Sequence, residues 1–169
     1  AAHCLWNKRT RSWLVPDAIK FLAGYRRRDF IAHGKVGDYT LADPLVTPND
    51  GARFRPHDWA ILHLAEPIDG ITGMLPLGLP GTPVRETFRQ VKKDKQHILT
   101  VDEGCKVDDT PRRDKLLLHK CDAVSGDSGS PILGIAGDTL VVIGVHIATR
   151  RYKKGESTGI AILTDSVSE

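Results

Sequence analysis

Short apolar runs separated by Gly, Pro and Asp recur along this chain, and this pattern is typical of β-strands joined by turns. Residues 136–139 (Ala-Gly-Asp-Thr) lie between two such runs and predict a tight hairpin. Residues 102–104 (Asp-Glu-Gly) predict a second hairpin, between runs at 96–101 and 105–107. The clearest other runs span residues 60–64, 115–119, 131–135, 140–147 and 159–163. Strands at this spacing indicate an all-β sandwich or barrel.

One segment, residues 17–24, predicts a helix. Pro16 and Asp17 would begin it and Gly24 would end it, with apolar side chains between them facing a core. Residues 69–90 are rich in Gly and Pro and show no clear periodicity, which indicates a linker. We therefore expect an N-terminal lobe over residues 1–78, a linker over 79–90 and a C-terminal lobe over 91–169.

Composition narrows the partners that the chain can have. The 169 residues include 24 Lys and Arg against 21 Asp and Glu, a formal net charge of +3, which is too small and too mixed to indicate nucleic acid. Basic clusters at 26–28, 92–95 and 150–154 lack the pattern of interleaved aromatic residues that stacks on bases, so we interpret them as solvated loops. The best apolar run, 139–148, is about half of the roughly 20 residues that a membrane span needs. No membrane span is expected.

The chain contains 3 cysteines, an odd number. Cys105 and Cys121 lie close enough in the sequence to form a disulfide, and Cys4 is the third. A disulfide would place the protein outside the cytosol. Because the chain begins without an initiator Met or a hydrophobic signal segment, we expect it to be a mature or truncated piece.

The strongest local motif is the segment 126–131 (Gly-Asp-Ser-Gly-Ser-Pro), directly before an apolar run. A nucleophilic serine needs an exposed hydroxyl on a tight turn, backbone N–H groups aimed at the developing oxyanion, and a base. Glycines on both sides of Ser128 permit the unusual backbone angles and leave room for a substrate. The N–H groups of Gly126 and Ser128 would then form the oxyanion hole. The alternative is a surface Gly-Ser loop.

Candidates for the base are the 7 histidines of the chain. His3 lies among small residues that would allow close packing around an imidazole. His57 precedes Asp58, but neighbours in a strand point to opposite faces, which argues against a bond between them. His146 lies inside an apolar strand, where a histidine is more often a core residue than a functional one. The others are expected on the surface or on strand faces: His33, His63, His97 and His119.

A catalytic histidine also needs a buried carboxylate that fixes its tautomer. Asp58 is the best candidate, because it directly precedes residues 59–62 (Trp-Ala-Ile-Leu) and would lie at the mouth of a buried strand. The alternative is that Asp58 is a turn residue at the start of that strand.

Three of these segments, taken in order, resemble the catalytic blocks of chymotrypsin-like (trypsin-fold) serine proteases: residues 1–4 (Ala-Ala-His-Cys), 58–62 and 126–131. The order His, Asp, Ser distinguishes this family from subtilisins and α/β-hydrolases. The stretch from Cys105 through Cys121 to residue 133 is more similar to the bacterial, glutamyl-endopeptidase-like branch than to digestive trypsins.

The resemblance implies an all-β fold of two six-stranded antiparallel Greek-key β-barrels, the first incomplete in this chain. It implies a serine endopeptidase in which Ser128 is the nucleophile, His3 the general base and Asp58 the group that orients His3. It further implies a protein or peptide substrate, no metal or organic cofactor, a secreted or periplasmic location and a monomer.

The resemblance also bears on Cys4 and Asp127. In the family, the cysteine after the catalytic histidine pairs with one in an earlier strand, so the start of the first barrel is expected to be missing here. In many relatives the mature N-terminus forms an ion pair with the aspartate before the nucleophile, which is Asp127 in this chain. An inactive fragment of a protease is therefore an alternative to an active enzyme.

The sequence leaves the preferred residue at the cleavage site open. Asp122 lies six residues before Ser128, at the position where trypsin-like enzymes bind Arg or Lys, and it could instead be structural. His146 matches the position at which glutamyl endopeptidases bind a Glu side chain, although the hydroxyl residue expected beside it is Ala123 here. Gly159 resembles a glycine that lines the pocket wall.

Two other functions are compatible with parts of the pattern. A protease-like binding protein would keep the fold for interaction, but such proteins usually lose at least one member of the triad. A His-rich metal-binding β protein fits poorly, because the histidines are scattered and Cys105 and Cys121 have no close-spaced ligand pair.

Overall fold

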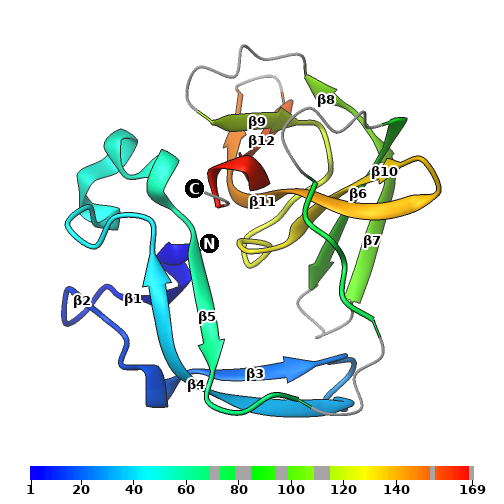
Figure 1. The fold of residues 1–169 in the computed structure, drawn as a ribbon. Helices are drawn as coiled ribbons and strands as arrows, with labels where there is room; N and C mark the ends of the chain where they lie inside the picture. Colours follow the sequence, from blue (N-terminus) through cyan, green and yellow to red (C-terminus); the bar gives the residue numbers. More distant parts are fainter. Residues whose placement is uncertain (69–72, 79–84, 94–98, 109–114, 153–154, 168–169) are drawn as a thin grey trace. The chain divides into compact units, whose positions relative to one another are not determined.

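The structure is a computed structural model that describes residues 1–68, 73–78, 85–93, 99–108, 115–152 and 155–167 (Figure 1). It consists of two compact units. The first contains Ala1–Met74 and Lys95–Ile98, and the second contains Leu75–Asp94 and Leu99–Glu169. The described residues form antiparallel strands and short 3₁₀ helices, which confirms the all-β prediction. Within this part of the chain, no helix is long and apolar enough to cross a membrane.

The first unit holds a three-stranded sheet in the order β3-β4-β5 and a separate two-stranded ribbon. Its strands are β1 (Trp6–Asn7), β2 (Ser12–Trp13), β3 (Lys20–Ala23), β4 (Ala32–Leu41) and β5 (Ala60–Leu64). Its 3₁₀ helices are η1 (Ala2–Leu5), η2 (Pro16–Ala18), η3 (Pro48–Arg53) and η4 (Arg55–His57). The core packs Ala2, Val46 and Phe54 against Trp13, Leu41 and Ala60. This core reaches the start of the chain, because Ala2 is buried in it.

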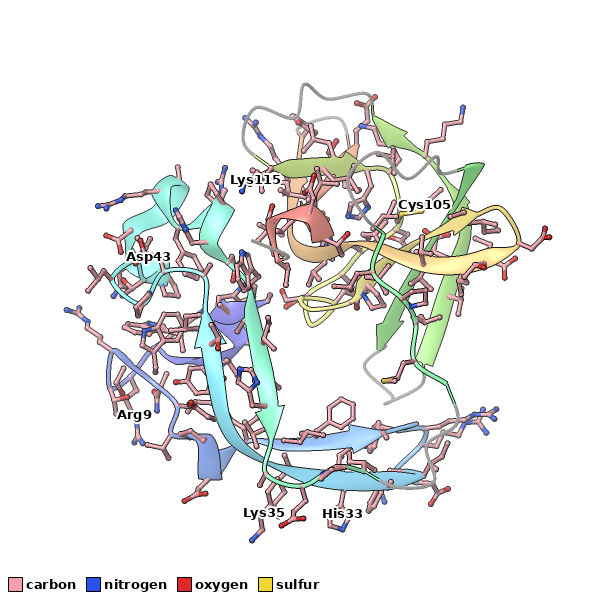
Figure 2. All side chains as sticks on the ribbon, in the orientation of Figure 1. Arg9, His33, Lys35, Asp43, Cys105 and Lys115 are labelled. Carbon is pink, nitrogen blue, oxygen red and sulfur yellow. A yellow bond between two sulfur atoms is a disulfide. The ribbon has the colours of Figure 1, made fainter. Side chains whose placement is uncertain are left out.

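Strand β4 follows the expected alternation of side chains between two faces. His33 and Lys35 are exposed on one face (Figure 2), and Val36 next to them is buried. The exposed position of His33 confirms the prediction for that residue.

The helix predicted over residues 17–24 is wrong. Residues 16–18 form η2, and the chain then continues as β3, whose Lys20 pairs with Lys35 and whose Ala23 pairs with Ala32 of β4. Eight residues are too few for a stable isolated helix, because the first turn is costly to nucleate. Pairing with β4 satisfies the same backbone groups, and Gly24 (φ 60°) begins the turn between the two strands.

The second unit is one seven-stranded antiparallel sheet in the order β7-β6-β10-β11-β12-β9-β8. The two edge strands of this sheet, β7 and β8, follow each other in the chain, with only Lys106 between them. The core contains Ile132, Val141, Ile143 and Ala161. The elements are β6 (Arg85–Lys93), β7 (Leu99–Cys105), β8 (Val107–Asp108), β9 (Leu116–His119), β10 (Pro131–Ala136), β11 (Thr139–Arg151), β12 (Ser157–Leu163) and η6 (Thr164–Ser166).

The hairpin predicted at residues 136–139 is confirmed, since Ala136 pairs with Thr139 and Gly137 takes a positive φ of 62°. The hairpin predicted at residues 102–104 is wrong, because these residues belong to β7. Phe88 of β6 pairs with Cys105 and Arg89 pairs with Glu103, which leaves Gly104 (φ 72°) as the extra residue of a β-bulge. A bulge glycine therefore produced the turn signal. Residues 96–98 of that prediction lie outside the described residues.

The linker predicted over residues 79–90 needs a correction at its end. Residues 85–90 form the first part of β6, which pairs with β7 on one side and β10 on the other. This polar strand is held by backbone hydrogen bonds to both neighbours. Its sequence shows no alternation of apolar and polar residues, so the sequence pattern did not predict a strand here.

Candidate active site

His3 and Asp58 lie 55 residues apart in the sequence and form a close pair in the first unit. The Asp58 Oδ2 atom lies 2.7 Å from His3 Nδ1. The other carboxylate oxygen, Oδ1, accepts a hydrogen bond of 2.8 Å from the backbone N–H of His3. Because both oxygens bind one residue, the carboxylate fixes the position of the backbone and the orientation of the ring together.

The local fold explains why these two residues meet. Ala2 is buried in the core, and its N–H donates to the backbone carbonyl of Asp58 over 3.2 Å. Asp58 ends η4 and precedes β5, and it is only 5% exposed. The small side chain of Ala2 allows the start of the chain to approach this buried carboxylate.

The pair changes the acidity of the histidine. The hydrogen bond to Asp58, with a smaller contribution from Cys4, raises the pKa of His3 from its ordinary value of 6.5 to about 9, although burial opposes the shift. Hydrogen bonding to His3 lowers the pKa of the Cys4 thiol in turn. The imidazole therefore binds a proton more strongly than an isolated histidine does.

Ser128 belongs to the second unit, in the loop between β9 and β10. Gly126 (φ 104°) and Gly129 (φ 92°) on either side of it occupy backbone conformations that favour glycine. The buried side chain of Asp127 braces this loop, with Oδ2 accepting from the N–H of Val124 over 2.7 Å. Among the described residues, Asp127 Oδ1 has no hydrogen-bond partner. The two glycines therefore take the unusual backbone angles that the sequence predicted.

A cavity of about 240 Å³ opens beside this serine. Among the described residues that line it, Arg151 is the one Lys or Arg, and no carboxylate is present. The lining residues are Ala123, Val124, Ser125, Gly126, Ser128, His146, Ala148, Thr149 and Arg151.

The three candidate specificity residues lie in different places. His146 lines the cavity. Asp122 is exposed and does not line it, and its backbone N–H donates to Asp102 Oδ2 over 2.6 Å. Gly159 does not line it either, because it lies against the ring of His119, where a Cβ atom would overlap that ring.

Sequence reasoning missed three residues near this cavity. His119 lies on strand β9, as the expectation of a surface or strand-face position allowed, but it is fully buried, and β9 pairs with β8 on one side and β12 on the other. Thr149 and Arg151 line the cavity because the register of β11 shifts between His146 and Ala148, and this irregularity redirects the following side chains. The sequence carries no signal for that shift.

The remaining histidines differ in how they are held. His57 lies in η4 rather than in a strand, and His63 is exposed with its Nε2 atom 2.9 Å from Thr40 Oγ1. His97 lies outside the described residues. The part of the chain that the structure describes contains no group of three or more His, Cys, Asp or Glu residues that could hold a metal ion.

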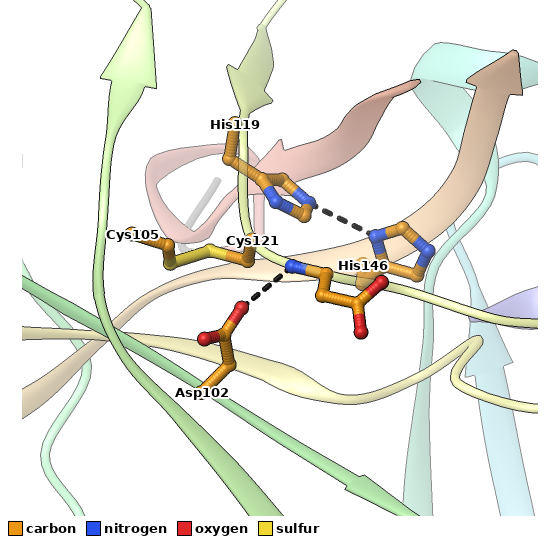
Figure 3. The surroundings of a disulfide bond; sticks show 6 residues. Asp102, Cys105, His119, Cys121 and His146 are labelled. Atoms are coloured by element: carbon orange, nitrogen blue, oxygen red, sulfur yellow. Dashed lines mark hydrogen bonds between the residues drawn. A yellow bond between two sulfur atoms is a disulfide. The ribbon is translucent and has the colours of Figure 1, made fainter. Parts of the chain in front are cut away.

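The predicted disulfide between Cys105 and Cys121 is present (Figure 3). It joins the end of β7 to the segment that follows β9. The next residue of that segment, Asp122, donates its backbone N–H to the Asp102 side chain of β7. Both links hold the start of the loop that leads to Ser128.

Comparisons with known proteins place the fold. No family model matches the chain, and no curated protein matches it. The chain is similar to a solved structure of a Glu endopeptidase in complex with MPD, with a TM-score of 0.68 and 17% sequence identity. The match covers 99% of this chain and 77% of that one. The chain therefore has the chymotrypsin-like fold, the fold of trypsin-like serine proteases.

Proposed function

We propose that this chain is a secreted or periplasmic serine endopeptidase that hydrolyses peptide bonds through Ser128, His3 and Asp58. The observation that carries the proposal is the short contact between His3 Nδ1 and the buried Asp58 carboxylate in a chymotrypsin-like fold. In this fold such a pair serves to hold the imidazole in the tautomer that can accept a proton at Nε2.

The reaction follows from these roles. Ser128 Oγ attacks the substrate carbonyl carbon while its proton passes to His3 Nε2, and Asp58 stabilises the imidazolium. The N–H groups of Gly126 and Ser128 stabilise the oxyanion, a contribution of roughly 3–4 kcal/mol per donor in other proteases. The tetrahedral adduct then loses the amine, which takes the proton from His3 and leaves an acyl-enzyme. Water attacks this ester in the same way and releases the second product.

The cavity supports a preference for an acidic or neutral polar residue before the scissile bond. His146, Thr149 and Arg151 supply hydrogen-bond donors to it, and no described residue of its lining is a carboxylate. A basic side chain would find no counter-charge there. The exposed position of Asp122 outside the lining weakens the trypsin-like alternative.

Cleavage of fluorogenic peptides with Glu, Gln, Lys or Leu before the reporter group tests the proposal. We expect hydrolysis that prefers Glu, that Ser128→Ala abolishes and that Ser130→Ala, a change in the same motif, leaves within a fewfold. Hydrolysis that survives Ser128→Ala would refute the role of this serine. A preference for Lys would refute the assignment of the cavity alone.

A further inference from the structure

The hairpin formed by β3 and β4 concentrates the net positive charge of the chain (Figure 1). Residues 20–35 contain five Lys and Arg and one Asp, whereas the whole chain has a formal net charge of +3. The rest of the chain therefore has a small excess of acidic residues. The three arginines at 26–28 are exposed, and no described residue forms an ion pair with them. The hairpin is thus a cationic surface of the first unit.

The turn at the tip of this hairpin goes against the preference of its residues. Arg26 and Asp29 exchange two backbone hydrogen bonds of 2.8 Å, which leaves Arg27 and Arg28 as the two turn residues. Both have a positive φ, 48° and 81°, as in a type I′ turn. Asn-Gly is the favoured pair in such a turn, and other residues are strained there. Two consecutive arginines at these positions cost stability, which points to a role outside the fold.

The strands behind the turn also keep positive charge against a local cost. Lys20 of β3 pairs directly with Lys35 of β4, and both side chains are exposed. Like charges that lie opposite each other destabilise a sheet. His33 lies on the same face of β4 as Lys35, two residues away (Figure 2). One face of the hairpin is therefore basic along its length.

Two large apolar side chains are exposed beside the arginines. Phe30 is 46% exposed and Ile31 is 75% exposed. The Phe30 ring meets the His33 ring edge to face, with centroids 5.6 Å apart, which places Phe30 on the basic face. We call residues 26–31, together with Lys20, His33 and Lys35, the hairpin surface.

A second cationic turn of the same unit shows what is particular to the hairpin surface. Lys8, Arg9 and Arg11 are exposed between β1 and β2. Their neighbours are polar and bond to one another, since Thr10 Oγ1 lies 2.8 Å from Ser12 Oγ. No large apolar side chain is exposed within residues 7–12. That turn carries charge alone, as a solvated loop does.

The combination of charge and apolar surface determines the kind of partner. A guanidinium group can bind a phosphate group with two N–H donors. An anionic membrane presents phosphates directly above hydrocarbon, so it can accept the arginines and the apolar side chains beside them at once. A nucleic acid offers no hydrocarbon layer to Phe30 and Ile31. An acidic peptide would need apolar residues of its own in a matching register.

We propose that the hairpin surface binds membranes that contain anionic phospholipids. The arginines at 26–28, with Lys20 and Lys35, contact lipid phosphates, and Phe30 and Ile31 enter the boundary between headgroups and acyl chains. This binding is peripheral and involves no residue of the proposed mechanism, so it does not rest on the protease assignment.

Co-sedimentation of the whole chain with vesicles tests the proposal. We expect binding to vesicles made of phosphatidylglycerol and phosphatidylcholine in equal parts, and none to phosphatidylcholine alone. Added salt should weaken this binding, because it screens charges at the surface.

The double variant Arg27→Asn and Arg28→Gly gives the turn the residues that it prefers. It should therefore melt at or above the Tm of the wild type, so that lost binding cannot be ascribed to unfolding. We expect it to bind the anionic vesicles roughly thirtyfold more weakly, since each basic residue near such a surface contributes about fivefold. Equal binding by this variant and the wild type would contradict the proposal.

Matched variants separate the hairpin surface from charge in general. The triple variant Arg26→Gln, Arg27→Gln and Arg28→Gln should bind roughly a hundredfold more weakly. The control Lys8→Gln, Arg9→Gln and Arg11→Gln removes as many cations from the other turn and should stay within a fewfold of the wild type. The variant Phe30→Ser and Ile31→Ser keeps every charge, and we expect it to bind roughly tenfold more weakly.

Three results would overturn the proposal. One is a wild type that does not prefer anionic vesicles. The second is an equal loss in the two triple variants, and the third is full binding by Phe30→Ser and Ile31→Ser. Binding of polyglutamate or RNA without binding of vesicles, lost in Arg27→Asn and Arg28→Gly, would assign the hairpin surface to an acidic polymer and contradict a membrane partner.

Discussion

At the scale of the residue, the Asp58 carboxylate determines what His3 can do. One oxygen receives the ring nitrogen and the other the backbone N–H, so the ring has a single favourable orientation. The same contact raises the pKa of His3 to about 9. A general base must be neutral before it can accept a proton. In the substrate-free chain, the contact with Asp58 therefore orients the His3 ring and also makes the ring bind a proton more strongly. That bound proton must leave before His3 can act as a base.

Removing the Asp58 charge separates these two effects. We expect Asp58→Asn to move the pKa of His3 down from about 9 towards 6.5, because its largest cause, the hydrogen bond to the carboxylate, loses its charge. A titration followed by NMR of the His3 ring measures the shift. Asp17→Asn, an exposed change elsewhere in the first unit, is the control and should leave the titration unchanged. A His3 pKa that is the same in the wild type and in Asp58→Asn would contradict the pairing.

The sign of the pH dependence follows from the same shift. The folded-state pKa of about 9 exceeds the ordinary 6.5. Protonated His3 therefore stabilises the fold fully below pH 6.5, as long as Asp58 is ionised, and the contribution is lost as the pH rises through 9. Activity should change in the opposite direction, with kcat/KM rising as His3 of the folded chain loses its proton around pH 9. In Asp58→Asn this rise should move to lower pH, while kcat/KM falls by about ten-thousandfold.

At the scale of the element, the placement of β9 between β8 and β12 turns an ordinary histidine into a buried one. Gly159 is the point of closest approach, because its strand passes directly over the His119 ring. The cavity beside Ser128 thus depends on strands that contribute none of its lining residues.

Gly159→Ala tests this packing. The added methyl group overlaps a ring that is buried on all sides, so we expect the free energy of unfolding to fall by about 1–3 kcal/mol, measured by denaturant titration. Gly34→Ala in β4 is the matched control, because the nearest atom to its added Cβ, 3.1 Å away, is the end of the Ile68 side chain, which can move. Equal stability of Gly159→Ala and the wild type would show that His119 does not occupy the described position.

The disulfide is the covalent counterpart of this packing. Cys105 and Cys121 are 16 residues apart. A disulfide that closes a loop of this length stabilises the folded state by about 3 kcal/mol. We expect the double variant Cys105→Ser and Cys121→Ser to lose about that much free energy of unfolding. A reducing agent should lower the Tm of the wild type and leave the Tm of the double variant unchanged. Equal Tm values for the two proteins under oxidising conditions would contradict a structural role.

Particular elements show what the sequence could predict and what it could not. The hairpin at residues 136–139 was predictable, because apolar runs flank a turn whose glycine has a positive φ. Strand β6 was not, since pairing on both sides holds it without apolar alternation. The pattern of residues 17–24 predicted a helix because eight residues are too few to distinguish the helical period of 3.6 from the strand period of 2. His119 was missed because its burial depends on which strands lie beside β9.

At the scale of the whole molecule, the proposed mechanism draws on both units. His3 and Asp58 belong to the first, and Ser128, Gly126 and His146 belong to the second. The pairing of His3 with Asp58 could be anticipated only through the order of three motifs along the chain, because a separation of 55 residues carries no geometric information by itself. The central claim is the proposal that Ser128 is the nucleophile and His3 its general base.

Labelling by a fluorophosphonate probe, with the modified residue located by mass spectrometry, tests this claim most directly. We predict that the probe modifies Ser128 in the wild-type chain, that Ser128→Ala abolishes labelling, and that His3→Ala slows it by orders of magnitude. His33→Ala, which removes an exposed histidine of the same unit, should label at the wild-type rate. Absence of labelling in the wild type, or labelling of Ser128 that is equally fast without His3, would contradict the account.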